Sequence, residues 1–488
     1  MGKMGTTPLI RALLKRDRMK TVPLHMPGHK RGSGISPGFA QLMQANPFSL
    51  DMTELPGLDD LHNPTGPIRD AQSHAASLFG ADRTFFLING STVGLHAAIM
   101  AVCGQGGEIL LPRDAHKSVI GACILCGAVP RYLPVRLNKE FMVPYPPTPG
   151  EVAKALVDYP AVKAVIQVYP TYFGLTGDLA AISKTAHDHG IPVIVDEAHG
   201  AHFRFSPRLP VPALDAGADL VVQSTHKTLG ALTQASMLHL KSRLLDYNNV
   251  ARQLGIIQST SPSYILMASL DAAAGDLSYR GITLLQKAVN VAERARSEIE
   301  KIPGIRCLDL TGDNGVIATD PTKLYISLRG IGLTGVAAAK MLLSKYHIQV
   351  EFSDLIGILC MFSLGNTTAD ADKLVSALRQ IGRERSMASS RKRAGLPNVT
   401  LGSLPHPIVV QSPREAWFSP TKQVLLNGAV GRVAAEIVAP YPPGIPILCP
   451  GEEITIEVVE TIRSLKAGKI LFHGPADRSL EYVTVVDC

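Results

Sequence analysis

Long apolar runs are missing from this sequence, since none approaches the ~18 residues that a membrane-spanning helix needs. The N-terminal stretch MGKMGTTPLIRALLKRDRMK is basic but has neither a continuous apolar core nor a small-residue cleavage site, so it does not resemble a secretory signal. Cysteine is scarce as well, and the seven cysteines are odd in number and mostly scattered, which is typical of a reducing compartment. We therefore expect a cytoplasmic protein that does not enter a membrane.

Strong charge of one sign is also missing. The net charge of +7 would suit a nucleic-acid partner. However, the basic residues form no long face and do not alternate with aromatic residues, which make up only 5% of the chain. The single dense basic cluster, GRERSMASSRKRAG at residues 382–395, is typical of an exposed connector. We expect no nucleic-acid partner and an interdomain linker at this cluster.

Metal-ligand patterns are weak. His187 and His189 in HDHG lack a third ligand at a suitable spacing, so a polar surface is the better interpretation. Cys123 and Cys126 form the only CxxC, and their neighbours are apolar, which favours two small core residues over a redox or zinc site. The sequence predicts no metal.

What the sequence does contain is a well-packed globular composition, with 46% hydrophobic and 18% charged residues. A chain of 488 residues is too long for one hydrophobic core, because cores stop growing near ~250 to 300 residues. Changes in pattern predict four regions. They are an N-terminal segment with active-site rim loops (1–65), a large α/β domain (66–290), a small α+β domain (291–385) and a C-terminal domain (396–488).

The large domain shows short apolar runs separated by helix-like segments. The runs cover residues 84–88, 108–112, 161–170, 191–200 and 219–227. Continuous apolar strands between helices predict a mainly parallel sheet that is covered on both faces, and ligands bind such sheets at the carboxyl ends of the strands. A long helical region follows Pro262, with an expected interruption near Gly281, and the small domain offers a strand (KLYISL) and a helix (GVAAAKMLLSKYH).

Three polar elements follow these strands. Ser91 and Thr92 lie where a helix begins after Asn89, so they are either ordinary helix caps or part of a phosphate site. Asp196 ends a buried strand, where a carboxylate needs a cationic partner. Lys227 ends the next strand, and a lysine whose pKa is lowered by burial can form a Schiff base with an aldehyde.

An anion site, a carboxylate for a ring nitrogen and an amine for an aldehyde are together what pyridoxal 5′-phosphate requires. With these three elements, the chain resembles the fold type I ornithine/lysine/arginine decarboxylase family. The resemblance rests on the motifs PLHMPGHKRG, NGST, DAHKS, DEAHGAHF, STHKTLGALTQAS and APYPPGIPILCPGE, which extend over nearly the whole chain. It implies the fold of a type I pyridoxal-phosphate enzyme, with a large cofactor-binding domain, a small domain and a C-terminal domain.

The resemblance also implies roles for individual residues. Lys227 would bond the cofactor and Asp196 would pair with its pyridine nitrogen. His116 would stack on the ring, although without the family it would be read as a helix-capping histidine. The remaining roles are phosphate binding by Ser91, Thr92 and Ser224, a place near the reacting carbon for His199 and His226, and further cofactor contacts by Gly90 and Ala198.

The reaction implied is α-decarboxylation of a basic amino acid, with Lys227 or His226 returning a proton to the α-carbon. The compact form of the chain favours arginine, converted to agmatine for polyamine biosynthesis, and lysine or ornithine is the alternative. Glu452 and Asp354 are candidates for the partner of the substrate's distal cation, but both are equally read as solvated loop charges. Another reaction of the same fold, an aminotransferase or carbon–sulfur lyase, or a silent regulatory homologue, remains a competing interpretation.

The family also suggests an assembly. Its large inducible members carry an extra N-terminal wing domain, whereas MPGHK here begins at residue 26. We therefore expect a homodimer or tetramer rather than a decamer. Active sites in this fold are generally built at a dimer interface, so residues 258–264 (QSTSPSY) are expected to complete the partner's site.

Overall fold

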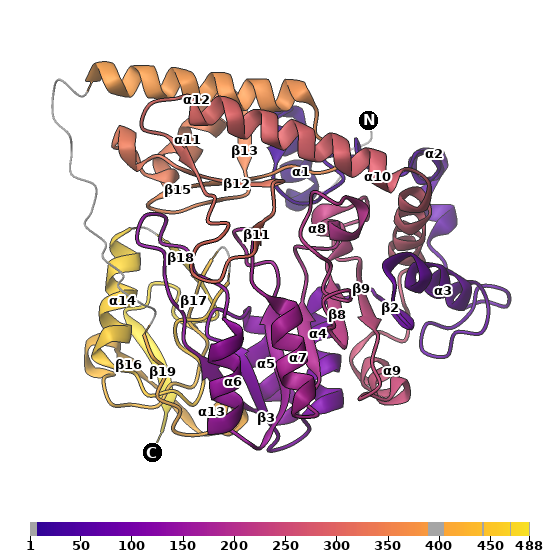
Figure 1. Ribbon diagram of the computed structural model, residues 1–488, viewed down its shortest axis with the longest axis vertical. Helices are drawn as coiled ribbons and strands as arrows, with labels where there is room; N and C mark the ends of the chain where they lie inside the picture. The colour runs from indigo at the N-terminus through magenta and orange to yellow at the C-terminus, as the bar shows by residue number, and fades with distance from the viewer. Residues whose placement is uncertain (1–6, 389–404, 442–443, 469, 488) are drawn as a thin grey trace.

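A seven-stranded sheet forms the centre of the chain in the computed structural model, which describes residues 7–388, 405–441, 444–468 and 470–487 (Figure 1). The strands, in spatial order, are β2 (Arg83–Leu87), β9 (Ser236–Leu240), β8 (Leu220–Gln223), β7 (Val193–Asp196), β5 (Val162–Val168), β3 (Glu108–Pro112) and β4 (Val129–Leu133). All neighbours are parallel except β9, which is antiparallel to both β2 and β8. The predicted α/β fold with a mainly parallel sheet is confirmed, and the five apolar runs contain five of its strands.

Helices cover both faces of this sheet. One layer contains α4 (Gly90–Val102), α5 (Lys117–Cys126) and α9 (Tyr247–Ile257), and the other contains α3 (Pro67–Phe79), α6 (Pro149–Asp158), α7 (Leu179–Asp188) and α10 (Tyr264–Glu300). Successive strand residues point to opposite layers, as the pleat requires: Ile109 packs in the first core and Leu110 in the second. Because both faces are buried, the strands read as continuous apolar runs.

The long helix α10 is continuous, so the predicted interruption near Gly281 is wrong. A Cβ at Gly281 would lie 2.8 Å from the ring carbon Cδ1 of Phe205. The glycine therefore provides space for an aromatic ring of the large domain rather than a break in the helix.

A second sheet contains β10 (Arg306–Cys307), β12 (Lys323–Ser327), β15 (Gly357–Met361) and β14 (Phe352–Ser353), all antiparallel to their neighbours. With α11 (Gly335–Tyr346) and α12 (Thr368–Ala388) it forms an α+β unit, in which the predicted strand and helix are both present. Near it, β1 (Val22–Leu24) pairs in parallel with β13 (Ile348–Val350) and brings the N-terminal segment against this unit. Two further short strands, β6 (Leu175–Thr176) and β11 (Ala318–Thr319), also pair.

The basic cluster at 382–395 is not a linker throughout, because α12 continues to Ala388. Residues 389–395 lie outside the described part of the chain. The C-terminal region contains α13 (Pro413–Phe418) and α14 (Ile456–Ala467), with the strand pairs β16 (Thr421–Leu425) with β19 (Tyr482–Val486) and β17 (Ala439–Tyr441) with β18 (Leu471–His473). It has a core of its own, and α13 packs on α5 of the large domain (Figure 1).

No helix in the described residues is both long and apolar enough to cross a membrane. The same residues hold no group of three or more histidine, cysteine or acidic side chains that could bind a metal. His187 instead contacts Asp219, with 2.7 Å between Nε2 and Oδ2. Cys123 is buried in the core beneath α5, Cys126 is half-buried, and both are free thiols.

Candidate active site

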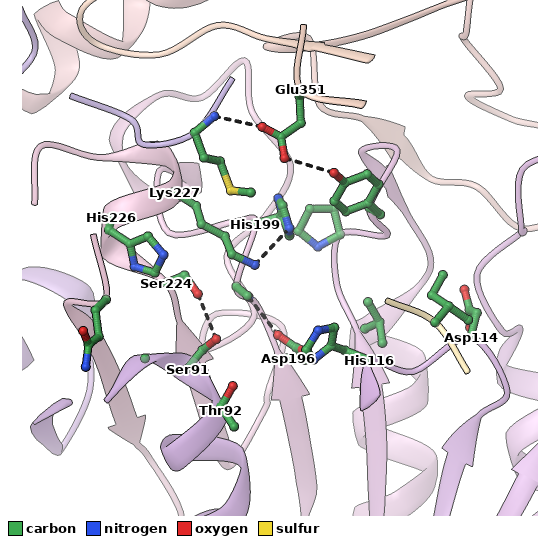
Figure 2. Close-up of a pocket in the computed structure, with 18 of the residues that line it drawn as sticks. Ser91, Thr92, Asp114, His116, Asp196, His199, Ser224, His226, Lys227 and Glu351 are labelled. Atoms are coloured by element: carbon green, nitrogen blue, oxygen red, sulfur yellow. Dashed lines mark hydrogen bonds between the residues drawn. The ribbon is translucent and has the colours of Figure 1, made fainter. Parts of the chain in front are cut away.

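A cavity of about 620 Å³ lies at the carboxyl ends of the central strands (Figure 2). All ten residues that the sequence nominated for the cofactor and the reacting carbon line it: Gly90, Ser91, Thr92, His116, Asp196, Ala198, His199, Ser224, His226 and Lys227. They come from separate turns that follow β2, β3, β7 and β8. Parallel strands deliver their carboxyl ends to one edge of the sheet, so the fold itself assembles this set.

Lys227 lies in α8 (Thr225–Thr228), a single turn that follows β8. Its Nζ is 3.1 Å from Nε2 of His199. Burial lowers the pKa of Lys227, and the carboxylate of Asp196 acts in the opposite direction. Burial also holds the pKa of His199 well below its usual range, so the imidazole is neutral and accepts a hydrogen bond from the lysine amine.

Asp196 is the last residue of β7, and one of its oxygens accepts a hydrogen bond of 3.1 Å from the backbone N–H of Ala198. Burial raises the pKa of this carboxyl, whereas the nearby Lys227 lowers it. Within the described residues no cation forms an ion pair with Asp196 at 4.0 Å or less. A buried carboxylate with one backbone donor can therefore bind a cationic partner.

The N-terminus of α4 supplies an anion-binding surface. The side chain of Asn89, at the cap position, makes no capping hydrogen bond, and although the amide of Gly90 donates to the carbonyl of Gln234 over 3.0 Å, the amides of Ser91 and Thr92 keep their donors for a ligand. The hydroxyl of Ser224 donates to Oγ of Ser91 over 2.9 Å, and Thr92 lies beside them. Amides, hydroxyls and the positive end of a helix of 13 residues suit a phosphate.

Two histidines frame the cavity. His116 is the cap residue of α5, since its Nδ1 accepts from the amide of Ser118, and it also faces the cavity, so the capping and platform interpretations are compatible. Burial lowers the pKa of His116 to about 3. His226 donates from Nδ1 to the carbonyl of Ala235 over 2.9 Å, and burial lowers its pKa to about 4. Both rings are therefore neutral at pH 7.

Sequence reasoning missed a carboxylate, Glu351, which lies between β13 and β14. In Figure 2 it is on the opposite side of Lys227 from Asp196. One oxygen accepts from the hydroxyl of Tyr172 over 3.0 Å and the other from the amide of Met26 over 2.9 Å. No local motif indicates Glu351, because long-range contacts such as the pairing of β1 with β13 bring its segment to the cavity.

A second missed carboxylate, Asp114, lies two residues after the end of β3, in the DAHKS motif. Its side chain is 7% exposed and lines the cavity beside Pro144, Val168 and Ile445. Burial raises the pKa of Asp114 to about 6. In the part of the chain that the structure describes, no basic side chain pairs with it.

The two residues proposed for the substrate's distal cation do not line the cavity, and neither is a solvated loop charge. Glu452 is buried and pairs with Arg113, with 2.9 Å between Oε2 and Nη2. Asp354 accepts from the hydroxyl of Tyr325 and from two backbone amides. Both carboxylates are therefore engaged by other groups of the protein, although Oε1 of Glu452 has no hydrogen-bond partner among the described residues, and the structure supports the prediction for neither.

Residues 258–264 also lie away from this cavity. They pack against the N-terminal loops, since the carbonyl of Ser259 contacts His62 and the hydroxyl of Tyr264 donates to the carbonyl of Asp59. Their expected contribution to a partner's site stays a prediction.

The comparisons with known proteins agree with this geometry. The family models described as Orn/Lys/Arg decarboxylase, major domain, and Orn/Lys/Arg decarboxylase, C-terminal domain, match residues 7–370 and 405–474. Arginine decarboxylase of Bacillus subtilis (strain 168) is 39% identical over 486 residues, with 98% of each chain covered. Lysine decarboxylase LdcA of Pseudomonas aeruginosa is 26% identical, covering 92% of this chain and 74% of that protein.

Among solved structures, the constitutive lysine decarboxylase of Escherichia coli superposes with a TM-score of 0.76 at 22% identity, over 99% of this chain and 82% of the other. At this identity the likeness concerns the fold. Because one family model matches most of the chain and a relative of 39% identity matches nearly all of it, the chain belongs to the Orn/Lys/Arg decarboxylase family.

Proposed function

We propose that this chain is a pyridoxal 5′-phosphate-dependent decarboxylase of arginine, which produces agmatine and carbon dioxide and so serves polyamine biosynthesis. The observation that carries the proposal is the amine of the half-buried Lys227 in one cavity with the carboxylate of Asp196 and the N-terminus of α4. The relatives support arginine over lysine, because the arginine decarboxylase of B. subtilis is 39% identical and the lysine decarboxylase of P. aeruginosa 26%.

The residues present fit the cofactor. The amides of Ser91 and Thr92 in the first turn of α4, with the hydroxyls of Ser91, Thr92 and Ser224, suit its phosphate. Among the described residues Asp196 has no ion-pair partner, as expected of a carboxylate that receives a protonated ring nitrogen. Nδ1 of His199 is buried without a hydrogen-bond partner, so the cavity also contains a polar atom that a bound group can satisfy.

When bound, pyridoxal phosphate supplies an aldehyde that bonds amines and a ring that accepts the electron pair left by departing carbon dioxide. Asp196 would hold the proton on the ring nitrogen, because its carboxylate is fixed by the amide of Ala198. His116 would pack against the ring as a neutral imidazole. The protein's contribution is therefore orientation and charge placement.

Lys227 is the better of the two candidates for returning the proton to the α-carbon. At pH 7 the ring of His226 is neutral, and its one N–H is engaged by the carbonyl of Ala235. The amine of Lys227 instead contacts a neutral acceptor, His199, and exchanges protons without breaking a structural bond.

Glu351 would bind the distal guanidinium of arginine. It is a cavity-lining carboxylate held in place by Tyr172 and Met26, and Figure 2 shows it across from Asp196, away from the expected ring nitrogen. A guanidinium matches a carboxylate through paired hydrogen bonds. We expect Glu351→Gln to lower kcat/KM for arginine by roughly thirtyfold, the equivalent of losing about 2 kcal/mol of one charge-assisted contact.

The test is to supply the cofactor-loaded protein with arginine, lysine and ornithine separately and to quantify carbon dioxide and amine. The proposal predicts agmatine and carbon dioxide in equal amounts from arginine, with far slower release from the other two. Preference for lysine or ornithine would overturn the choice of substrate. A keto acid without carbon dioxide would overturn decarboxylation itself.

A further inference from the structure

The turn between β3 and α5 presents His116 to the cavity, and it is short. β3 ends at Pro112 and α5 begins at Lys117, so four residues connect them. Asp114 and His116, two of these four, line the cavity. The direction of the imidazole therefore depends on what holds the residues on either side of it.

Arg113, the first residue of this turn, is held by the C-terminal region. Its guanidinium donates to Oε2 of Glu452 over 2.9 Å and to Sγ of Cys449 over 3.3 Å. It also lies over the ring of Tyr132, 5.0 Å from the ring centroid. The side chains of Arg113 and Glu452 are 4% and 3% exposed, so this ion pair is fully buried.

The C-terminal region also holds the other side of the turn. The amide of Lys117 donates to the carbonyl of Gly444 over 3.2 Å, and the neighbouring Ile445 lines the cavity. Further along, Arg414 of α13 donates to the carbonyls of Ile124 and Leu125 near the end of α5. Residues 414–452 therefore hold the turn and its helix at three points.

A buried ion pair is a costly means of stabilisation, because apolar residues of the same volume often perform as well or better. The presence of an ion pair here indicates that the turn must be held in one orientation. The planar guanidinium donates hydrogen bonds only in its own plane, and Glu452 is fixed in turn by the amide of Cys449, which donates to Oε2 over 2.9 Å.

We propose that Glu452 is a positioning residue for the reaction, which acts through Arg113 to fix the turn that places His116 against the cofactor. This inference rests on the proposed function, because His116 needs a ring to face. It gives Glu452 a role other than the substrate contact that the sequence suggested.

The experiment compares Glu452→Gln and Arg113→Lys with the wild-type protein, each reconstituted from apoprotein and pyridoxal phosphate. The readouts are visible circular dichroism of the bound cofactor, its dissociation constant, and kcat and KM for arginine. We expect weaker dichroism, a dissociation constant raised about tenfold, and kcat lowered about tenfold or more at nearly constant KM, because small misplacements of catalytic groups are costly and Glu452 touches no substrate.

The control is Arg131→Met, which removes the ion pair between Arg131 in the middle of β4 and Glu108 at the start of β3, the end of that strand remote from the turn. It is expected to leave all cofactor readouts at wild-type values. If Glu452→Gln melts no lower than the control and its cofactor readouts equal those of the wild type, the inference is wrong. If Glu452→Gln does not fold, Arg113→Lys decides by the same comparison.

The wild-type protein separates this inference from the proposed function. Its products test the decarboxylation of arginine, whereas the variants test Glu452 through cofactor binding and dichroism, whichever amino acid is consumed. A wild-type protein that does not bind pyridoxal phosphate would overturn both.

Discussion

Three acidic residues line the same cavity in three different environments. Asp196 accepts from one backbone amide, Glu351 accepts from a hydroxyl and an amide, and Asp114 has an apolar wall and a pKa raised to about 6 by burial. Because their environments differ, we expect the three carboxyl groups to bind different partners. The environment of each also decides how much stability its charge costs the apoprotein.

Asp114 should make the stability of the apoprotein fall as pH rises. The unfolded chain releases this proton near pH 4, whereas the folded chain keeps it up to about pH 6. The penalty for the buried charge is therefore absent below about pH 4, grows between pH 4 and 6, and is complete above that. At pH 8, Asp114→Asn should unfold at a higher urea concentration than the wild type, with a free energy of unfolding greater by up to about 3 kcal/mol. The free energies of unfolding of the two proteins should become equal near pH 4.

The control is Asp51→Asn, since Asp51 is exposed in a loop. It should shift stability little at either pH. Equal stability of Asp114→Asn and the wild type at pH 8 would show that the carboxyl carries no such penalty.

At this scale the sequence was informative where a polar residue lies at or shortly after the end of an apolar strand. Asp196, the last residue of β7, and Lys227, in the helical turn that follows β8, could therefore be predicted. Glu351 could not, because it reaches the cavity through the pairing of β13 with β1, more than 300 residues apart in sequence. Glu452 was misassigned because its partner, Arg113, is equally distant in sequence.

At the scale of elements, α10 shows that tertiary contacts decide the structural role of a glycine within a helix. Its two glycines, Gly275 and Gly281, both lie inside a continuous helix of 37 residues. A Cβ at Gly275 would meet nothing within 4 Å, whereas one at Gly281 would lie 2.8 Å from the ring of Phe205. The periodicity of the apolar residues located the helix. No local pattern indicates that the ring of Phe205 packs on Gly281, so this glycine was interpreted as an interruption.

The two glycines should respond oppositely to alanine. Gly275→Ala should stabilise the protein by about 0.5 to 1 kcal/mol, because alanine is the better helix former. Gly281→Ala should destabilise it by about 1 kcal/mol, since overpacking against Phe205 exceeds that gain. Thermal unfolding of both variants beside the wild type is the measurement, and a rise in Tm for Gly281→Ala would refute the packing argument.

At the scale of the whole molecule, the C-terminal region completes the large domain, through the ion pair of Arg113 with Glu452 and the packing of α13 on α5. The sequence indicated a separate C-terminal region after the basic cluster at residues 382–395. It could not show that this region reaches the active-site turn, because such contacts depend on surfaces that form only after folding. The apolar side chains of α1 (Pro8–Arg18) are in turn exposed, Leu9 by 70% and Leu13 by 61%.

A homodimer should cover surfaces of this kind. Sedimentation equilibrium of the full-length protein is expected to give at least twice the 52.1 kDa of the single chain. Leu9→Asp with Leu13→Asp should lower the association constant if α1 contributes, because a charge would be buried at the contact. A monomer at micromolar concentration would contradict the expected assembly.

The central claim is that Lys227 is the residue that bonds the cofactor, and its most direct test is chemical. The protein loaded with pyridoxal phosphate is reduced with borohydride and digested, and the modified lysine is located by mass spectrometry. Two other buried lysines, Lys30 and Lys323, have pKa values lowered to about 7 by burial and serve as internal controls. The account predicts the label on Lys227 and its loss in Lys227→Ala, and a label on Lys30 or Lys323 would contradict it.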